Sequence, residues 1–157
     1  MEITKERSLS NLNAKRRNEM CKIGDIIVVK DVKVGSKEIK QHSFIVLSTD
    51  KGEIEGLSFD LVTNIMSSFE GKSDDYKRKK LSHPENMPYD PSEENIPNGH
   101  GKEGFIKAGV YFLFDRKNTD FYVLGNVETE LYLKLIDFIN NMNPENIKYI
   151  IDNLKNE

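Results

Sequence analysis

Short runs of β-branched and aromatic residues, separated by turns that glycine marks, constrain the fold of this chain more than any other feature. Three runs, Ile26–Val29, Phe44–Leu47 and Val110–Phe114, are continuously apolar. Runs of this length and composition are typical of buried strands. The segment from Leu57 to Ser68 alternates imperfectly, which predicts a third strand with one buried face. The chain is therefore expected to be rich in β-structure.

The remaining segments are predicted to contain further short strands, loops and two helices. Further short strands are expected at Phe105–Ile106 and just before Gly125, and loops at 34–41 and 51–56. Two helices are expected over about 129–155, the first with Thr129 as N-cap. Asn143-Pro144 would start the second helix, because Asn is a good N-cap and Pro suits the first helical position. Its apolar stripe would be Ile147, Ile150, Ile151 and Leu154.

Two segments differ in composition from the rest. Residues 1–22 are polar with sparse apolar positions, which predicts an N-terminal helical extension. Residues 70–103 hold four of the five prolines and few aliphatic residues, which predicts a long, partly mobile loop. The domain proper would then span 23–157. The predicted class is α+β, mainly β: a small antiparallel barrel with C-terminal helices and the N-terminal helical extension.

Composition limits the compartment and the chemistry. The 157 residues suit one domain, and no apolar run approaches the length that spans a bilayer. Cys21 is the only cysteine, and no signal peptide precedes it, so a reduced, cytoplasmic protein without membrane contact is expected. One thiol and three histidines make a metal cluster improbable, and no phosphate-binding loop motif is present. No metal and no cofactor are therefore predicted.

Positive charge is concentrated although the net charge is −3. The segment YKRKKLSH places Lys77, Arg78, Lys79 and Lys80 together just before His83. Such a strip on an acidic chain fits a protein that holds a short polyanion locally. The alternative is a solvated run of charges on a loop.

Two histidines and a pair of serines are the candidates for chemistry. His42 precedes the Phe44–Leu47 run, so a strand would hold its backbone, and Pro84 restricts His83 to extended backbone. Histidine can transfer protons near neutral pH. Ser67-Ser68 ends the third strand, where hydroxyl groups can donate to a phosphate oxygen. Each of these residues also has an ordinary structural explanation, as a surface histidine or as a serine that terminates a strand.

The order of these pieces resembles the PemK/MazF toxin family over roughly residues 23–142. Gly24–Ile27 matches the family's opening strand, and Gln41–Val46 stands at the entrance to its second strand. Ser48–Asp50 stands in the following polar turn, and Met66–Ser68 occupies the end of the third strand, where the family has a hydroxyl residue. The final section, from Gly104 onward, has the family's short strands followed by a helix.

The resemblance implies an SH3-like barrel, a homodimer and a metal-independent endoribonuclease that cleaves single-stranded RNA and is neutralised by a cognate antitoxin. Many such systems are carried by plasmids and prophages. The family's arginine and proline at the second strand are His42 and Ser43 here, and its catalytic threonine aligns with Ser67 or, in a shifted register, Thr63. Histidine loses the permanent double donor of arginine but keeps acid–base capacity.

The sequence therefore predicts a growth-inhibiting endoribonuclease that uses attack by the RNA 2′-hydroxyl. The expected catalytic residues are His42, Ser67, Ser68 and His83, and the expected RNA-binding residues are Lys40, Gln41, Arg78, Lys79 and Lys80. Two alternatives stay open. One is a catalytically inactive RNA- or protein-binding module, which the loss of the arginine favours. The other is a barrel toxin controlled by an RNA antitoxin.

Overall fold

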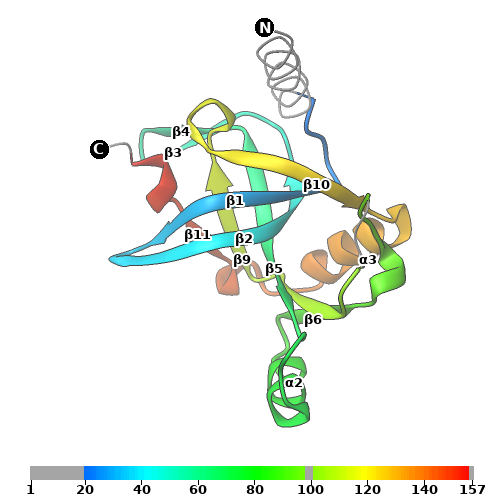
Figure 1. Cartoon of the computed structure of the whole chain (residues 1–157). Coiled ribbons are helices and arrows are strands. Elements are labelled where there is room, and N and C mark those ends of the chain that lie inside the picture. Colours follow the sequence, from blue (N-terminus) through cyan, green and yellow to red (C-terminus); the bar gives the residue numbers. More distant parts are fainter. Residues whose placement is uncertain (1–19, 98–100, 156–157) are drawn as a thin grey trace, which may run out of the picture.

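A long β-hairpin opens the described part of the chain (Figure 1). The structure is a computed structural model and describes residues 20–97 and 101–155. Strand β1 (Asp25–Val34) pairs with β2 (Lys37–Ser48) through a turn in which Gly35 has a φ of +63°. The β-branched Ile26–Val29 run is buried as predicted, because this part of β1 lies between two neighbouring strands. The expected loop at 34–41 is much shorter, since β2 begins at Lys37.

Nine strands form one mainly antiparallel sheet in the order β11-β9-β5-β2-β1-β10-β7, with β8 and β6 branching from β5. The additional strands of this sheet are β5 (Leu61–Ser68), β6 (Asn86–Tyr89), β7 (Glu94–Asn95), β8 (Gly104–Lys107), β9 (Val110–Phe114), β10 (Phe121–Val127) and β11 (Lys148–Ile150). Only the pairing of β11 with β9 is parallel among the described strands. A separate hairpin consists of β3 (Gly52–Ile54) and β4 (Leu57–Phe59).

Strand β5 changes partners midway. Its first half pairs with β9, from Leu61↔Phe114 to Thr63↔Phe112, and its second half pairs with β8, from Met66↔Ile106 to Ser68↔Gly104. Asn64 lies at the change and donates from its side-chain amide to the Val110 carbonyl, at 2.9 Å. The sheet therefore forks at the middle of β5.

Two apolar cores lie on the two faces of the sheet. Helix α3 (Thr129–Asn140) covers one face with Leu131, Leu135 and Ile139. The Tyr132 hydroxyl donates to the Leu47 carbonyl at 2.9 Å, which fastens this helix to the end of β2. The second core is centred on Phe44, whose ring packs edge-on against Phe112 and Phe114. Each face of the sheet is thus closed by its own set of apolar residues.

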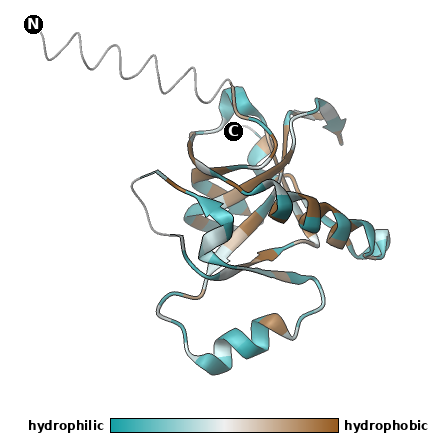
Figure 2. Cartoon of the chain, turned by 90° about the vertical axis from the view of Figure 1, so that its right-hand side faces the viewer, coloured by the Kyte–Doolittle hydropathy of each residue, from teal (hydrophilic) through white to brown (hydrophobic). Residues whose placement is uncertain are grey.

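Helix α2 (Asp74–Leu81) stands apart from both cores. It has no buried residue and is mostly hydrophilic in Figure 2, where it protrudes beyond the sheet on the two connections that join it to β5 and β6. Ser73 caps it by accepting from the Tyr76 N–H at 3.2 Å. The helix carries Lys79 and Lys80 in its last turn.

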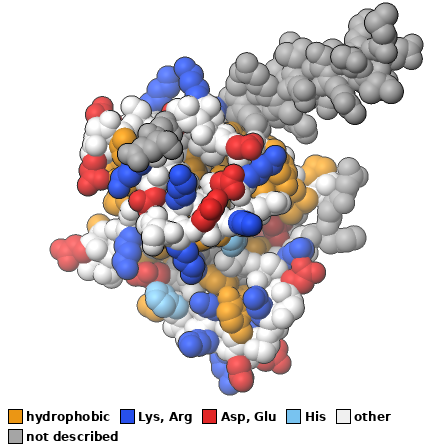
Figure 3. Space-filling model, turned by 60° about the vertical axis from the view of Figure 1, so that its left-hand side comes forward, with side chains coloured by type: hydrophobic (Ala, Val, Ile, Leu, Met, Phe, Trp, Pro, Cys, Tyr) orange, Lys and Arg blue, Asp and Glu red, His pale blue; other side chains and the backbone are white. Residues whose placement is uncertain are grey.

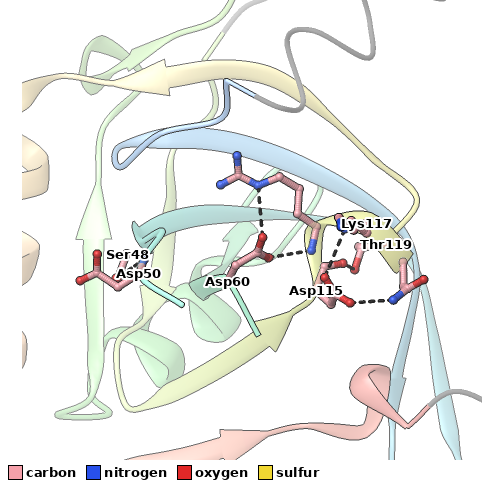
Figure 4. A network of polar contacts seen from close by, with 8 residues as sticks. Ser48, Asp50, Asp60, Asp115, Lys117 and Thr119 are labelled. Atoms are coloured by element: carbon pink, nitrogen blue, oxygen red, sulfur yellow. Dashed lines mark hydrogen bonds and ion pairs between the residues drawn. The ribbon is translucent and has the colours of Figure 1, made fainter. Parts of the chain in front are cut away.

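A polar network at the opposite end of the sheet fixes the β9–β10 connection (Figure 4). Asp60 accepts from the Arg116 N–H at 2.7 Å, and its carboxylate lies 3.8 Å from the Arg116 Nε. Asp115 accepts from the Asn118 side-chain amide at 2.6 Å and from the Lys117 N–H at 3.3 Å. These contacts hold the short 3₁₀ turn η2 (Arg116–Asn118) in place.

The mainly β, α+β class is confirmed, and several elements need correction. The expected last helix is wrong: Pro144–Asn146 and Asp152–Leu154 are 3₁₀ turns, and β11 between them pairs with β9. The expected loop over 70–103 instead contains α2, β6, β7 and the 3₁₀ turn η1 (Pro91–Glu93). The loop at 51–56 belongs to the β3–β4 hairpin. The first C-terminal helix is present as α3, which begins at Thr129 and has Glu128 instead of the expected Thr129 as N-cap.

The predicted closed barrel is not found among the described strands, and the predicted N-terminal helix lies mostly outside the described residues. The two ends of the sheet, β11 and β7, are not paired with each other, so the described strands form an open sheet and no closed barrel. Residues 1–19 of the expected N-terminal helix lie outside the described residues, and residues 20–22 are not helical. None of the helices in the described ranges is long and apolar enough to cross a membrane.

Candidate active site

A cavity of about 560 Å³ opens where β2, β5 and β10 meet the segment after β6. We call it the His42 cavity. Its polar lining includes Gln41, His42, Ser43, Ser68, Tyr89, Glu94, Lys102 and Tyr122, and its apolar lining is Val28, Met66, Ile96 and Leu124. The structure therefore brings His42, Gln41 and Ser68, three of the predicted site residues, to one cavity.

His42 is half-buried within β2 and not at a loop boundary as expected. Its ring packs edge-on against Phe44 at 6.2 Å between centroids, and its Nδ1 accepts from the Ser43 N–H at 3.1 Å. Burial lowers the pKa of this imidazole from 6.5, and the charge of Lys107 lowers it further. At neutral pH the ring is consequently neutral, the form that can accept a proton.

The backbone next to His42 is strained. Gln41 has a φ of +29°, which is rare for a residue with a side chain. Such outliers are found disproportionately at active and ligand-binding sites. Here the strained residue lines the same cavity as the histidine that follows it.

Glu94 supplies a carboxyl group that sequence reasoning missed. It lines the His42 cavity, and burial raises its pKa from 4.5, although the N–H and charge of Lys102 act in the opposite direction. The Lys102 N–H donates to Glu94 Oε1 at 3.0 Å. Beside it, Tyr89 is buried, and that burial together with the charge of Glu94 raises the pKa of its phenol. The cavity thus holds a carboxyl with a raised pKa on the sheet face of Met66, whereas the contact with Phe44 puts the His42 ring on the opposite face.

The structure separates the three hydroxyl candidates. Ser68 lines the His42 cavity, and its Oγ accepts from the Glu70 N–H at 2.9 Å. Ser67 pairs with Phe105 and is not part of that lining. Thr63 is fully buried and donates to the Phe112 carbonyl at 3.0 Å, so its hydroxyl cannot reach a substrate. Ser68 is therefore the hydroxyl of this cavity, whereas the register Phe44↔Ile65 places Ser67 on the sheet face of His42.

A second, strongly basic cavity of about 360 Å³ lies between α2 and the β8–β9 turn. We call it the basic hollow. Its cationic and titratable lining consists of Lys79, Lys80, His83, Lys107 and Lys148, with Glu85 as the one carboxylate. His83 is exposed, and its Nδ1 accepts from the Glu85 N–H at 3.4 Å. His83 and His42 thus line different cavities.

Lys107 links the two cavities electrostatically. Burial lowers the pKa of Lys107, and the charge of Lys80 lowers it further, while the charge of Lys107 lowers the pKa of His42. The register pairs Phe44 with Ile65 and Met66 with Ile106, so strand alternation puts Lys107 on the sheet face of Phe44 and His42. In Figure 3 two separate histidine patches lie on one face, one of them recessed, with Lys and Arg side chains around them.

The remaining predicted contacts lie outside both cavities. Lys40 is exposed and opposite Asp31 in the β1–β2 hairpin. Arg78 is exposed on α2, with its guanidinium 3.1 Å from the Asp75 carboxylate. Neither residue is part of the lining described above, so their predicted role in RNA binding has no support from this geometry.

Three lining residues escaped sequence reasoning. Lys148 was assigned to a helix, and the β-forming run IKYII around it was the available signal for a strand. Lys107 and Glu94 carried no signal, because their importance comes from neighbours that are distant in the sequence.

Among the described residues no three His, Cys, Asp or Glu side chains are grouped as a metal site requires, and metal independence stays a prediction. No protein-family model matches the chain, and no curated protein matches it significantly.

Proposed function

We propose that this protein is an endoribonuclease toxin of the PemK/MazF type, which cleaves single-stranded RNA without a metal. The observation that carries the proposal is the sheet face of His42, where a neutral imidazole on β2 and Ser67 on the adjacent β5 lie next to a hollow lined by lysines. Acid–base groups beside a surface that attracts phosphates are what phosphodiester cleavage by an internal nucleophile needs.

In the proposed reaction His42 takes the proton of a 2′-hydroxyl while its oxygen attacks the adjacent phosphorus. The bond from phosphorus to the 5′-oxygen breaks, and a water molecule gives its proton to that leaving oxygen, which releases hydroxide. The products are a 2′,3′-cyclic phosphate and a 5′-hydroxyl end. Ser67 donates to a non-bridging oxygen as negative charge develops there. Neither Glu94 nor His83 supplies the proton in this scheme, because Glu94 lies in the cavity on the opposite sheet face and His83 in the basic hollow.

Other parts of the proposal come from the family resemblance. The mainly β sheet with its C-terminal helix agrees with that family's fold class, although the described strands form an open sheet and not a closed barrel. A homodimer, a cognate antitoxin and carriage on a plasmid or prophage are the corresponding expectations for assembly and regulation.

One observation favours a second candidate, a binding module without catalysis. The Ser43 N–H occupies the Nδ1 lone pair of His42, so the neutral ring offers its Nε2–H as a hydrogen-bond donor. A donor in this place would hold a phosphate oxygen where the family has arginine, without removing a proton.

Expression of the full chain from an inducible promoter, with mapping of RNA 5′-hydroxyl ends, separates the two candidates. We expect growth arrest and new 5′-hydroxyl ends, and a loss of about 10²- to 10⁴-fold in cleavage by purified His42→Ala. His83→Ala is the matched control and should stay within a few-fold of the wild type. Binding of RNA without new ends would establish the binding module and reject the nuclease.

A further inference from the structure

The basic hollow is assembled from four parts of the chain. Helix α2 contributes Lys79 and Lys80, the segment after it His83, β8 Lys107, and β11 Lys148. Strand β11 reaches this place only because it pairs in parallel with β9, where Lys148 is opposite Val110. The concentration of charge is therefore a product of the tertiary fold and extends well beyond the KRKK run.

The four lysines of the hollow have no carboxylate partner. Every ion pair among the described residues uses other cations. Lys80 lies 5.4 Å from the centre of the Tyr76 ring, which is a weak contact. Glu85, the one carboxylate of the lining, forms no ion pair with the four lysines and could offset one of their charges at most. Like charges gathered at one place repel one another, and a bound anion is the usual compensation.

We infer that the basic hollow is a binding subsite for phosphodiester groups of the RNA strand that neighbour the one cleaved at His42. This inference rests on the proposed function and extends it to a site outside the His42 cavity. Lys107 acts on both cavities, so a strand lying along it would place consecutive phosphates in a continuous positive field.

The lining favours a nucleic-acid strand over an acidic protein segment. Val110 supplies the only apolar side chain of the hollow's lining. Protein interfaces are built around an apolar centre, whereas single-strand binding grooves follow the backbone with positive charge. The hollow matches the second description.

The test uses the full chain and 2′-O-methyl oligoribonucleotides, which lack the attacking hydroxyl and cannot be cut. Binding of a dinucleotide and of an octanucleotide is measured by fluorescence anisotropy over a series of KCl concentrations, for the wild type, Lys148→Gln and Lys107→Gln. Lys51→Gln, an exposed lysine outside both cavities, is the matched control.

For the octanucleotide we expect each hollow variant to reduce the slope of log K against log[salt] by about 0.7, the value for one phosphate contact on a single strand. Lys51→Gln should leave it unchanged, and the dinucleotide should bind all four proteins alike. Lys148→Gln carries the test if Lys107→Gln folds poorly, since Lys148 is exposed on an edge strand.

The inference would be overturned if the salt slope of octanucleotide binding were the same for both hollow variants as for Lys51→Gln, even if the chain cleaves RNA. If the salt slope for the octanucleotide depends on Lys107 and Lys148 but the chain never cleaves RNA, the result would support the subsite and reject only the nuclease proposal. Competition with poly-glutamate gives a third outcome: a peptide that displaces the octanucleotide and binds more tightly through the same lysines would assign the hollow to a protein partner.

Discussion

At the scale of single residues, burial shifts the pKa values of two groups on opposite faces of the sheet. The pKa of His42 is lowered from 6.5, and that of Glu94 is raised from 4.5, in both cases mainly through burial. Only His42 lies on the sheet face of Ser67 and Lys107, so its pKa is the one that the proposed reaction depends on.

The pH dependence of cleavage follows from these directions. We expect kcat/KM to rise with pH below 6.5, as His42 loses its proton. Lys107→Gln removes a positive charge that lowers the pKa of His42, so the rising limb should move to higher pH. Glu94→Gln should leave the rising limb in place, because Glu94 lies on the opposite sheet face. An unmoved rising limb in Lys107→Gln, beside the Lys51→Gln control, would contradict the assignment of His42 as the base.

Residue identity alone indicated only part of this site. His42 and the serine pair stood out because each terminates or interrupts an apolar run, and the register places His42 and Ser67 on one sheet face. The choice between Ser67 and Ser68 depends on which face of β5 each occupies, and a one-residue difference reverses that face. Glu94 and Lys107 became candidates only through burial and through distant neighbours.

At the scale of elements, helix α3 shows how one face of a helix carries the stability. Leu135 is fully buried against the sheet, whereas Leu133, two residues earlier, is 60% exposed. Residues two positions apart in a helix point to nearly opposite sides. Substituting either leucine with alanine removes the same side-chain volume, so the two variants differ in whether that side chain is packed against the sheet.

Leu135→Ala should therefore lower the free energy of unfolding by about 2–5 kcal/mol, from lost apolar burial and the cavity left behind. Leu133→Ala should change it by less than about 0.5 kcal/mol. Urea unfolding followed by circular dichroism measures both. Equal losses in the two variants would contradict the packing of α3 described above.

Elements that local sequence preferences determine were predicted from the sequence, whereas elements that depend on pairing with distant segments were not. The runs at Ile26–Val29 and Val110–Phe114 predicted their strands, because β-branched and aromatic residues favour that state locally. The segment at 144–155 has helical apolar spacing but becomes β11 with flanking 3₁₀ turns, since pairing with β9 outweighs local preference. Open-sheet connectivity has no local signal, and composition could not distinguish it from a barrel.

At the scale of the whole molecule, the only cysteine is a reporter of cooperative unfolding. Cys21 is 5% exposed and belongs to the core around Phe44. Burial, followed by the charge of Asp25, raises the pKa of its thiol to about 12. The reactive thiolate is therefore scarce in the folded protein at ordinary pH, and the sulfur is inaccessible as well.

We expect alkylation of Cys21 by iodoacetamide to be at least about 10²-fold slower in the native protein than in urea, with a midpoint that coincides with unfolding by circular dichroism. Mass spectrometry over a urea series measures it, and Cys21→Ser serves as the unlabelled control. Rapid labelling well below the unfolding midpoint would show that the segment around Cys21 opens separately from the core.

The sheet's outer strands have a consequence for assembly. Both ends of the described sheet are short, three residues in β11 and two in β7, and the branch ends on β6, where Pro88 lacks an N–H. None of these edges offers a long row of free backbone groups as a template for another strand. Among the described strands the protruding part of the β1–β2 hairpin differs, because residues 37–41 of β2 pair with β1 alone. A second copy, or an antitoxin segment, that extends the sheet would accordingly have to bind along this hairpin, and recognition elsewhere would use side chains on the faces and loops.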